Sequence, residues 1–115
     1  MELDMRYRFY LQIKLQDDNW KMVGEYHEIQ WDYRDLIKAS SGWHIINRER
    51  VGQASDFVPK LRRGIIELRE SADAYKEFEL SLGLGTIKNV LSFYESLLND
   101  CEKYPYTELF GSVAG

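Results

Sequence analysis

The chain contains two histidines, His27 and His44, and any nucleophilic triad or histidine-based metal site would have to use at least one of them. His27 falls on the polar side of an alternating stretch, and His44 lies beside apolar residues. Histidines in such settings more often hold structure through hydrogen bonds than act as bases or ligands. We therefore predict structural roles for both, with no metal site and no cofactor.

The single cysteine, Cys101, excludes an internal disulfide framework and is too few for the usual ligand set of a zinc site. It falls on the apolar side of an expected helix, near the C-terminal end, where the helix dipole disfavours a thiolate. We predict a buried core residue rather than a nucleophile. A lone cysteine also indicates a reducing compartment, so we expect a cytoplasmic protein.

Two further patterns could bind phosphate or move protons. Residues 83–86, Gly-Leu-Gly-Thr, precede an expected helix but lack the Gly-Lys-Ser/Thr ending of a phosphate loop. The carboxylate pairs Glu25/Glu28 and Asp32/Asp35 have no apolar surroundings that would push their pKa values apart, as acid–base catalysis requires. We predict solvated charges here, no catalytic residue, and a protein that is not an enzyme.

Charge is distributed unevenly along the chain, whose formal net charge is −4 and isoelectric point about 5.2. Residues 48–69 hold six basic and three acidic side chains, whereas residues 70–108 hold eight acidic side chains against three lysines. Arg6, Arg8 and Tyr10 form a basic and aromatic mixture typical of single-strand nucleic-acid binders, but the negative net charge disfavours that partner. We expect a modestly dipolar surface, or two ordinarily solvated faces, and no nucleic acid.

The composition is that of a folded domain, with 44% hydrophobic and 30% charged residues. A chain of 115 residues has room for one hydrophobic core, so we expect a single domain over residues 1–115. Neither a signal-peptide run nor a membrane-length apolar stretch occurs, so no membrane association is expected.

The N-terminal part predicts a β-hairpin. Apolar residues alternate with polar ones from Met5 to Leu15, turn formers fill residues 16–19, and residues 20–29 read as a returning strand. We expect Gly24 to mark a bulge or a close backbone approach. The second strand is expected to bury Trp20, Met22 and Tyr26.

A short helix capped by Asp32 and ended by Gly42 is expected next, followed by a third strand around residues 43–46. Two longer helices then start near Asp56, with Pro59 in the first turn, and at a capping Thr86. Their expected buried stripes contain Phe57, Leu61, Ile65, Leu68 and Ala72, then Ile87, Val90, Leu91, Tyr94, Leu97, Leu98 and Cys101.

Three details complete the expected helices. Gly64 lies on the first stripe and is expected to allow close packing against another element. A short amphipathic turn over residues 75–80 and a flexible link over residues 82–85 are expected between the helices. Tyr104 and Pro105 should end the last helix, and residues 111–115 are expected to form a loose tail.

These elements predict an α+β fold, in which an N-terminal antiparallel β-hairpin of two to three strands has two main α-helices packed on one face. A helical bundle with an appended hairpin is the alternative. The last two thirds of the chain also resemble small uncharacterised bacterial proteins, some of which look like immunity partners of secreted toxins. The residues that carry this resemblance are Ser41, Gly42, Trp43, Asn47, Gly52, Pro59, Arg63, Gly64, Ile65, Leu68, Tyr75, Gly83, Gly85, Thr86, Leu97, Leu98, Cys101 and Pro105.

The resemblance and the lack of catalytic motifs imply a non-enzymatic protein-binding inhibitor, such as a bacterial immunity protein that neutralises a toxin or nuclease. An aromatic content of 14% is more than one small core readily hides. The expected partner-binding residues are four acidic residues and four aromatic residues outside the buried stripes: Glu70, Asp73, Glu77, Glu79, Tyr10, Trp31, Phe93 and Tyr106.

A cationic toxin is the expected partner, so the acidic C-terminal half should matter more for binding than the basic middle. The sequence is also compatible with a homodimer. The alternative function is a small-ligand-binding or enzymatic domain with a cleft between sheet and helices, with Trp43 and His44 near its mouth.

Overall fold

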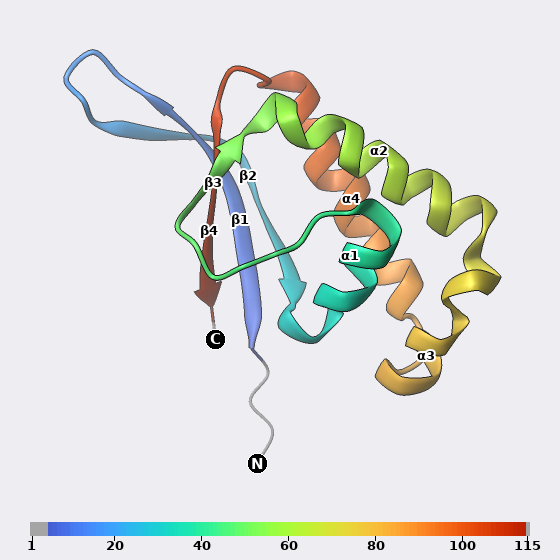
Figure 1. The fold of residues 1–115 in the computed structure, drawn as a ribbon. Helices are drawn as coiled ribbons and strands as arrows, with labels where there is room; N and C mark the ends of the chain where they lie inside the picture. The colour runs from blue at the N-terminus through green and yellow to red at the C-terminus, as the bar shows by residue number, and fades with distance from the viewer. Residues whose placement is uncertain (1–4, 115) are drawn as a thin grey trace.

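The computed structural model describes residues 5–114. In this part of the chain, four strands form one antiparallel sheet in the spatial order β2-β1-β4-β3 (Figure 1). The strands are β1 (Arg6–Lys14), β2 (Trp20–Gln30), β3 (Arg50–Gln53) and β4 (Glu108–Ala114). The helices are α1 (Arg34–Ser41), α2 (Ala54–Glu70), α3 (Lys76–Leu82) and α4 (Thr86–Lys103), with 3₁₀ turns η1 (Trp31–Tyr33) and η2 (Ala72–Tyr75).

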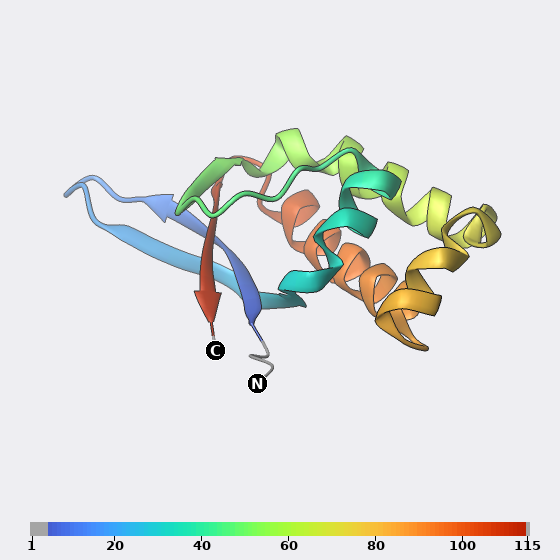
Figure 2. The same cartoon turned by 60° about the horizontal axis from the view of Figure 1, so that its bottom comes forward.

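The helices lie on one side of the sheet, and the α+β expectation is confirmed at that level (Figures 1 and 2). Helix α4 packs against β2 on one side and α2 on the other, and α1 packs against α2. The sheet has four strands rather than two or three, and two shorter helices accompany the two main ones. The buried hydrophobic residues form one cluster between the sheet and the helices.

Strand β1 follows the predicted alternation along its length. Tyr7, Phe9 and Leu11 are buried beneath the helices, whereas the even-numbered side chains lie on the opposite face. Strand β2 faces the opposite way to its prediction. The pairing register shifts opposite Tyr10, at the bulge around Gly24, where four residue steps on β2 face two on β1, and this even number of extra residues keeps the alternation. Odd-numbered residues on both sides of the bulge therefore face the helices, so His27 is buried and Tyr26 is 53% exposed, and the predicted burial of Trp20, Met22 and Tyr26 was wrong.

The predicted third strand at residues 43–46 was also wrong. Trp43 and Ile45 are buried there, but the segment is irregular and no strand pairs with it. The Tyr7 hydroxyl lies within hydrogen-bond distance of the Ile46 and Arg48 carbonyls and accepts from the Arg48 amide at 3.1 Å. A side chain therefore satisfies this backbone, and the third strand in sequence begins only at Arg50, beside β4.

Helices α2 and α4 match their predicted stripes except for Ala72, which lies beyond the end of α2 in η2, and their N-terminal ends need correction. Helix α2 begins at Ala54, so Pro59 lies in the second turn rather than the first. Helix α4 is capped by Gly85 in a left-handed conformation, and Thr86 is the first helical residue, with its hydroxyl donating to the Gly83 carbonyl at 2.7 Å. Gly64 packs against the Tyr94 ring, as predicted, because an added Cβ would lie 2.8 Å from Tyr94 Cδ2.

The predicted loose tail was wrong for the residues that the structure describes. Residues 108–114 form β4, which lies between β1 and β3 and buries Leu109 and Phe110. Gly111 is required there because an added Cβ would lie 2.9 Å from the Phe9 ring. Small residues in this segment therefore allow close packing between strands rather than flexibility.

Candidate binding site

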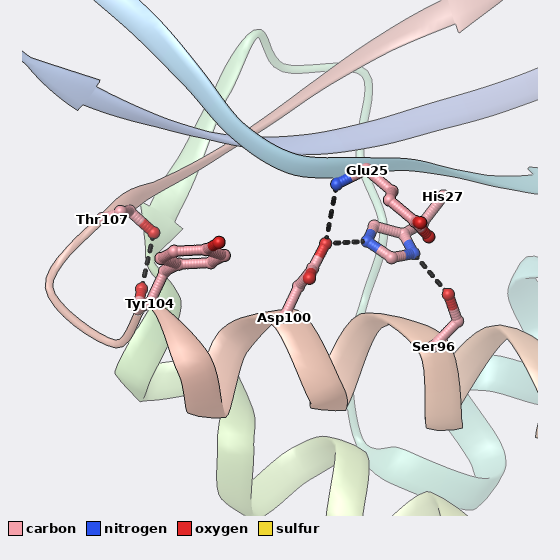
Figure 3. A network of polar contacts seen from close by, with 6 residues as sticks. All are labelled: Glu25, His27, Ser96, Asp100, Tyr104 and Thr107. Carbon is pink, nitrogen blue, oxygen red and sulfur yellow. Dashed lines mark hydrogen bonds and ion pairs between the residues drawn. The ribbon is translucent and has the colours of Figure 1, made fainter.

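A chain of hydrogen bonds joins β2 to α4 at the side of the molecule shown in Figure 3. His27 Nδ1 lies 2.7 Å from Ser96 Oγ, and His27 Nε2 lies 2.7 Å from Asp100 Oδ2. The same carboxylate oxygen accepts the Glu25 amide proton at 2.9 Å. Ser96 and Asp100 face the strand together because residues four apart share one side of a helix.

The order serine, histidine, aspartate is that of a nucleophile activated by a general base. If His27 Nε2 carries the proton and donates it to Asp100, Nδ1 can accept from the Ser96 hydroxyl. Ser96, however, lies in the interior of α4, where backbone N–H groups bond within the helix instead of forming an oxyanion hole. The arrangement therefore supports a structural role for His27, as predicted, in a place that the sequence did not predict.

Gly24 allows this contact between strand and helix. Its φ of 73° places it in the left-handed region, and an added Cβ would lie 2.7 Å from Asp100 Cγ. The prediction that Gly24 marks a bulge or a close backbone approach is confirmed in both respects. The bulge brings the Glu25 amide to the carboxylate of Asp100.

A cleft of about 460 Å³ runs beside this network, between β2 and α4. Its walls are the β2 segment from Tyr26 to Gln30 and one face of α4, with Arg6 and Tyr33 at the margin. The residues from α4 are Asn89, Ser92, Phe93 and Ser96. A cleft between sheet and helices was the alternative expectation, but Trp43 and His44 line a different pocket, of about 290 Å³.

The face of the sheet opposite the helices carries an aromatic cluster. Tyr10 lies at its centre, with ring centroids 5.5 Å from Tyr26 and 5.9 Å from Phe110. Trp20 meets Phe110 edge-on at 5.0 Å. Burial, followed by the nearby charge of Glu49, raises the pKa of Tyr10, so its hydroxyl stays protonated at neutral pH. We call these residues, with Arg8, Lys14 and Arg50, the aromatic face.

Basic side chains cover the rings of the aromatic face. The Arg8 guanidinium lies 4.7 Å from the Tyr26 centroid, and the Arg50 guanidinium lies 5.1 Å from that of Trp20. Two acidic residues partly balance them. Arg8 pairs with Glu28 at 3.3 Å and Arg50 with Glu108 at 3.5 Å. Rings and paired charges therefore make up a mixed surface without a strong electrostatic sign.

The predicted aromatic contacts occupy four different settings. Tyr10 is the centre of the aromatic face. Trp31 stacks on Tyr7 at 5.2 Å beneath the Arg34 guanidinium, and Tyr106 is 63% exposed. Phe93 is only 5% exposed, because α4 is buried on its sheet side as well as its α2 side, and it contributes to the wall of the cleft beside β2 rather than to an open surface.

The predicted acidic contacts lie around η2 and α3, at the end of the molecule away from the hairpin tip (Figure 1). Glu70, Asp73 and Glu77 are exposed there. Glu79 instead has a local role, because its carboxylate accepts the Gly85 and Ile87 amide protons at the start of α4.

Sequence reasoning missed several residues of these surfaces. Trp20 and Tyr26 were assigned to the core, and Ser96, Asp100 and Phe110 were not singled out. The available signal for a buried polar contact was a pair of polar residues four apart on one helix, Ser96 and Asp100.

The basic and acidic segments of the sequence pair with each other across the helices. Arg62 and Arg69 on α2 form ion pairs with Glu102 and Glu95 on α4. The charge separation expected from the sequence is therefore smaller on the folded surface, because some basic residues of segment 48–69 neutralise acidic residues of segment 70–108.

Comparison of the chain with protein-family models, with curated proteins and with solved structures gives no match. Within residues 5–114, no helix combines the length and the apolar character needed to cross a membrane. In the same part of the chain, no three His, Cys, Asp or Glu side chains are grouped so that they could hold a metal ion.

Proposed function

We propose that the protein is a non-enzymatic binding domain and that the aromatic face contacts a partner protein. The observation that carries this proposal is a sheet face without helical cover, on which four aromatic rings touch and arginines lie over two of them. Aromatic residues and arginine are enriched at protein interfaces, and Trp, Tyr and Arg dominate binding hot spots.

The charge on this face supports a protein partner over a nucleic acid. Binding a phosphate backbone needs unopposed lysine and arginine, whereas Arg8 and Arg50 are already paired with Glu28 and Glu108. A protein surface can present both positive and negative groups to match these ion pairs. The Arg8–Glu28 and Arg50–Glu108 pairs can then be desolvated beside an aromatic ring.

A toxin or nuclease is the partner class that we propose, with this chain as the immunity-type inhibitor. Its support is the sequence resemblance over residues 41–105, together with an exposed surface suited to protein contact. A cytoplasmic location and the possibility of a homodimer remain predictions from the sequence.

The test uses Trp20→Ala and Tyr26→Ala, which truncate the rings beneath Arg50 and Arg8. Proteins that copurify with the tagged chain, and the product of the neighbouring gene, would be purified and titrated against it. Each substitution should weaken binding at least about tenfold, as expected for a hot spot. Ile66→Ala is the control, because Ile66 is 52% exposed on α2, away from the aromatic face, and it should leave affinity unchanged.

Two outcomes would count against the proposal. One is a confirmed partner whose affinity is unchanged by both ring truncations. The other is the absence of any partner that binds the purified wild-type chain. Inhibition of a toxin would be tested separately, by growth of cells that express the partner with and without this chain.

The alternative, a small-ligand or enzymatic domain, has one observation in its favour, the Ser96–His27–Asp100 chain beside a cleft. Its support is weaker because His27 is 4% exposed and no free backbone donors surround Ser96. Labelling of Ser96 by a fluorophosphonate probe, absent in Ser96→Ala, would favour this alternative.

A further inference from the structure

Strand β2 is an edge strand, and part of its backbone has no strand beside it. The order β2-β1-β4-β3 leaves one side of β2 without a neighbour in the described sheet. The Trp31 amide donates to the Met5 carbonyl at 2.9 Å, so by antiparallel alternation Ile29 and His27 also bond toward β1. The N–H and C=O of Glu28 and the N–H of Gln30 therefore point outward, away from β1.

The structure limits this open edge at both ends. On one side, the bulge at Gly24 and the bond from the Glu25 amide to Asp100 end the regular edge. On the other side, the chain turns into η1 at Trp31. Natural sheets protect their edges with such devices. The residues left between them, 26–30, also form the strand wall of the cleft.

Helix α4 supplies the opposite wall of the cleft. One face of the helix runs beside the edge and carries Asn89, Ser92, Phe93 and Ser96. These residues share a face because the last three follow Asn89 by three, four and seven positions. A groove between a strand edge and a helix is a geometry in which peptides bind by adding a strand.

We propose that this cleft binds an extended peptide segment of another protein, which pairs with residues 26–30 as an antiparallel fifth strand. Glu28 would exchange two backbone hydrogen bonds with one peptide residue, and the Gln30 amide would donate to the peptide carbonyl two residues away. The cleft shares Tyr26 with the aromatic face, whereas Trp20 belongs to the aromatic face and does not line the cleft, so Trp20 separates the two proposals experimentally.

The chemistry of the cleft indicates which side chains the peptide carries. Ser92 can both donate and accept, and Asn89 and Ser96 keep acceptor or donor capacity beside their bonds to Tyr33 and His27, so this wall favours small polar residues such as Ser, Thr or Asn facing α4. The charged residues among the described cleft lining are Arg6 and Glu28, and Glu28 is already paired with Arg8. Arg6 therefore favours an Asp or Glu at the end of the peptide beside Gln30, its partner in the β1–β2 pairing.

A second copy of this chain suits the edge less well than a peptide. Symmetric antiparallel pairing of the two open segments centres on their middle residue, so Glu28 would lie opposite Glu28 of the other copy. Like charges directly opposite each other on neighbouring strands are destabilising. We therefore assign the edge to a segment of a different protein.

The test begins with selection from a displayed library of short random peptides against the purified full-length chain. We expect enrichment of sequences with alternating small polar residues and an acidic residue at one end. Binding of the best synthetic peptide should slow hydrogen exchange at the Glu28 and Gln30 amides. Backbone N-methylation at alternate peptide positions should abolish binding, because only those amides face β2.

A matched pair of variants tests the backbone bond itself. Glu28→Pro removes the outward N–H, and proline is tolerated at an edge position that does not donate to the neighbouring strand. Glu28→Ala keeps that N–H and equally removes the ion pair with Arg8. The proline variant should bind the selected peptide about tenfold more weakly than the alanine variant, as expected for a lost hydrogen bond.

Circular dichroism shows whether Glu28→Pro folds. A second pair of variants tests the proposal even if it does not. Ser92→Trp should fill the cleft and abolish peptide binding, whereas Ser92→Ala should not. Trp20→Ala on the aromatic face should leave peptide binding intact, so failure of this proposal is distinguishable from failure of the proposed function. Three results would overturn it: no enriched peptide, equal binding by both members of a folded pair, or a dimer whose own contact protects the Glu28 and Gln30 amides.

Discussion

Asp100 is the side chain that holds β2 against α4. Its Oδ2 atom accepts from the Glu25 amide at 2.9 Å and lies 2.7 Å from His27 Nε2, and Asp100 is buried. A buried donor left without an acceptor costs about 1 to 3 kcal/mol. Truncation of Asp100 therefore affects two groups at once, whereas truncation of Ser96, on the exposed side of the network, affects one.

We predict that Asp100→Ala lowers the free energy of unfolding by about 2 to 4 kcal/mol, because it strands the Glu25 amide and the His27 ring. Ser96→Ala should cost less than about 1 kcal/mol. Urea denaturation of both variants checks the prediction. Equal losses in the two variants would show that the Asp100 contacts are not the important ones.

Gly64 sets how closely α2 approaches α4, because an added Cβ would clash with the Tyr94 ring, at 2.8 Å from Cδ2. We predict that Gly64→Ala destabilises the chain by about 1 to 3 kcal/mol, despite the better helix propensity of alanine. Thermal denaturation would be compared in wild-type and Tyr94→Leu backgrounds. The loss should shrink in the second background, and an equal loss in both would contradict the steric explanation.

Cys101 and Tyr94 are buried acids with raised pKa values. Burial, then the charges of Asp100 and Glu102, raises the pKa of Cys101 to about 12, and burial raises the pKa of Tyr94 to about 12. In the unfolded chain these groups ionise near 9.0 and 10.0. Above about pH 9 the unfolded state therefore releases protons that the folded state keeps, and stability falls as pH rises.

We predict that the free energy of unfolding decreases between about pH 8 and about pH 10.5. Each ionising group contributes a slope of at most about 1.4 kcal/mol per pH unit. Cys101→Ala should be less stable at every pH because of the cavity it leaves, but its pH slope should be shallower. Urea denaturation at several pH values measures both slopes. Parallel curves would contradict a contribution from Cys101.

At the scale of elements, β4 completes the sheet. It pairs with β1 along seven residues and with β3 on its other side, so its removal would expose the edges of both. Leu109 and Phe110 are buried, and the Gly111 amide donates to the Glu49 carbonyl at 2.9 Å. The connection from α4 to β4 is therefore as important to the sheet as the N-terminal hairpin.

We predict that a chain ending at Thr107 fails to fold, because it lacks the strand between β1 and β3. A chain ending at Val113 keeps nearly all of β4 and should melt cooperatively, within a few degrees of the full chain. Circular dichroism melting of both chains is the measurement. A cooperative transition in the shorter chain would show that β4 is dispensable.

For the whole molecule, the two proposed contact regions lie apart, with the acidic residues around α3 and the aromatic face on the sheet (Figures 1 and 2). The sequence favoured the acidic region, whereas the cluster of rings on the uncovered side favours the sheet. Long-range charge mainly changes the rate of association, whereas a buried aromatic contact mainly changes the rate of dissociation.

We predict that reversal of Glu70, Asp73 and Glu77 to Lys slows association with a cationic partner by less than about tenfold and has less effect at high salt. Glu79 is left out because its carboxylate bonds to the start of α4. Reversal of Lys60 and Arg63 on α2 is the control and should change little. Stopped-flow association at two salt concentrations distinguishes the sets, and a larger effect of the control would indicate an anionic partner.

The sequence by itself determined the features that depend on the spacing of residues within one helix or strand. The alternation of β1, the apolar stripes of α2 and α4, the close packing at Gly64 and the burial of Cys101 were all predicted correctly, because each depends on spacing within one element. The tertiary structure decided which distant segments pair. The short segment 108–114 is a strand because β1 and β3 bond to it, and His27 faces the helices because it pairs with Phe9 and because Ser96 and Asp100 bond to its ring. The local pattern of each segment does not show these contacts, because they are made with residues that lie far away in the sequence.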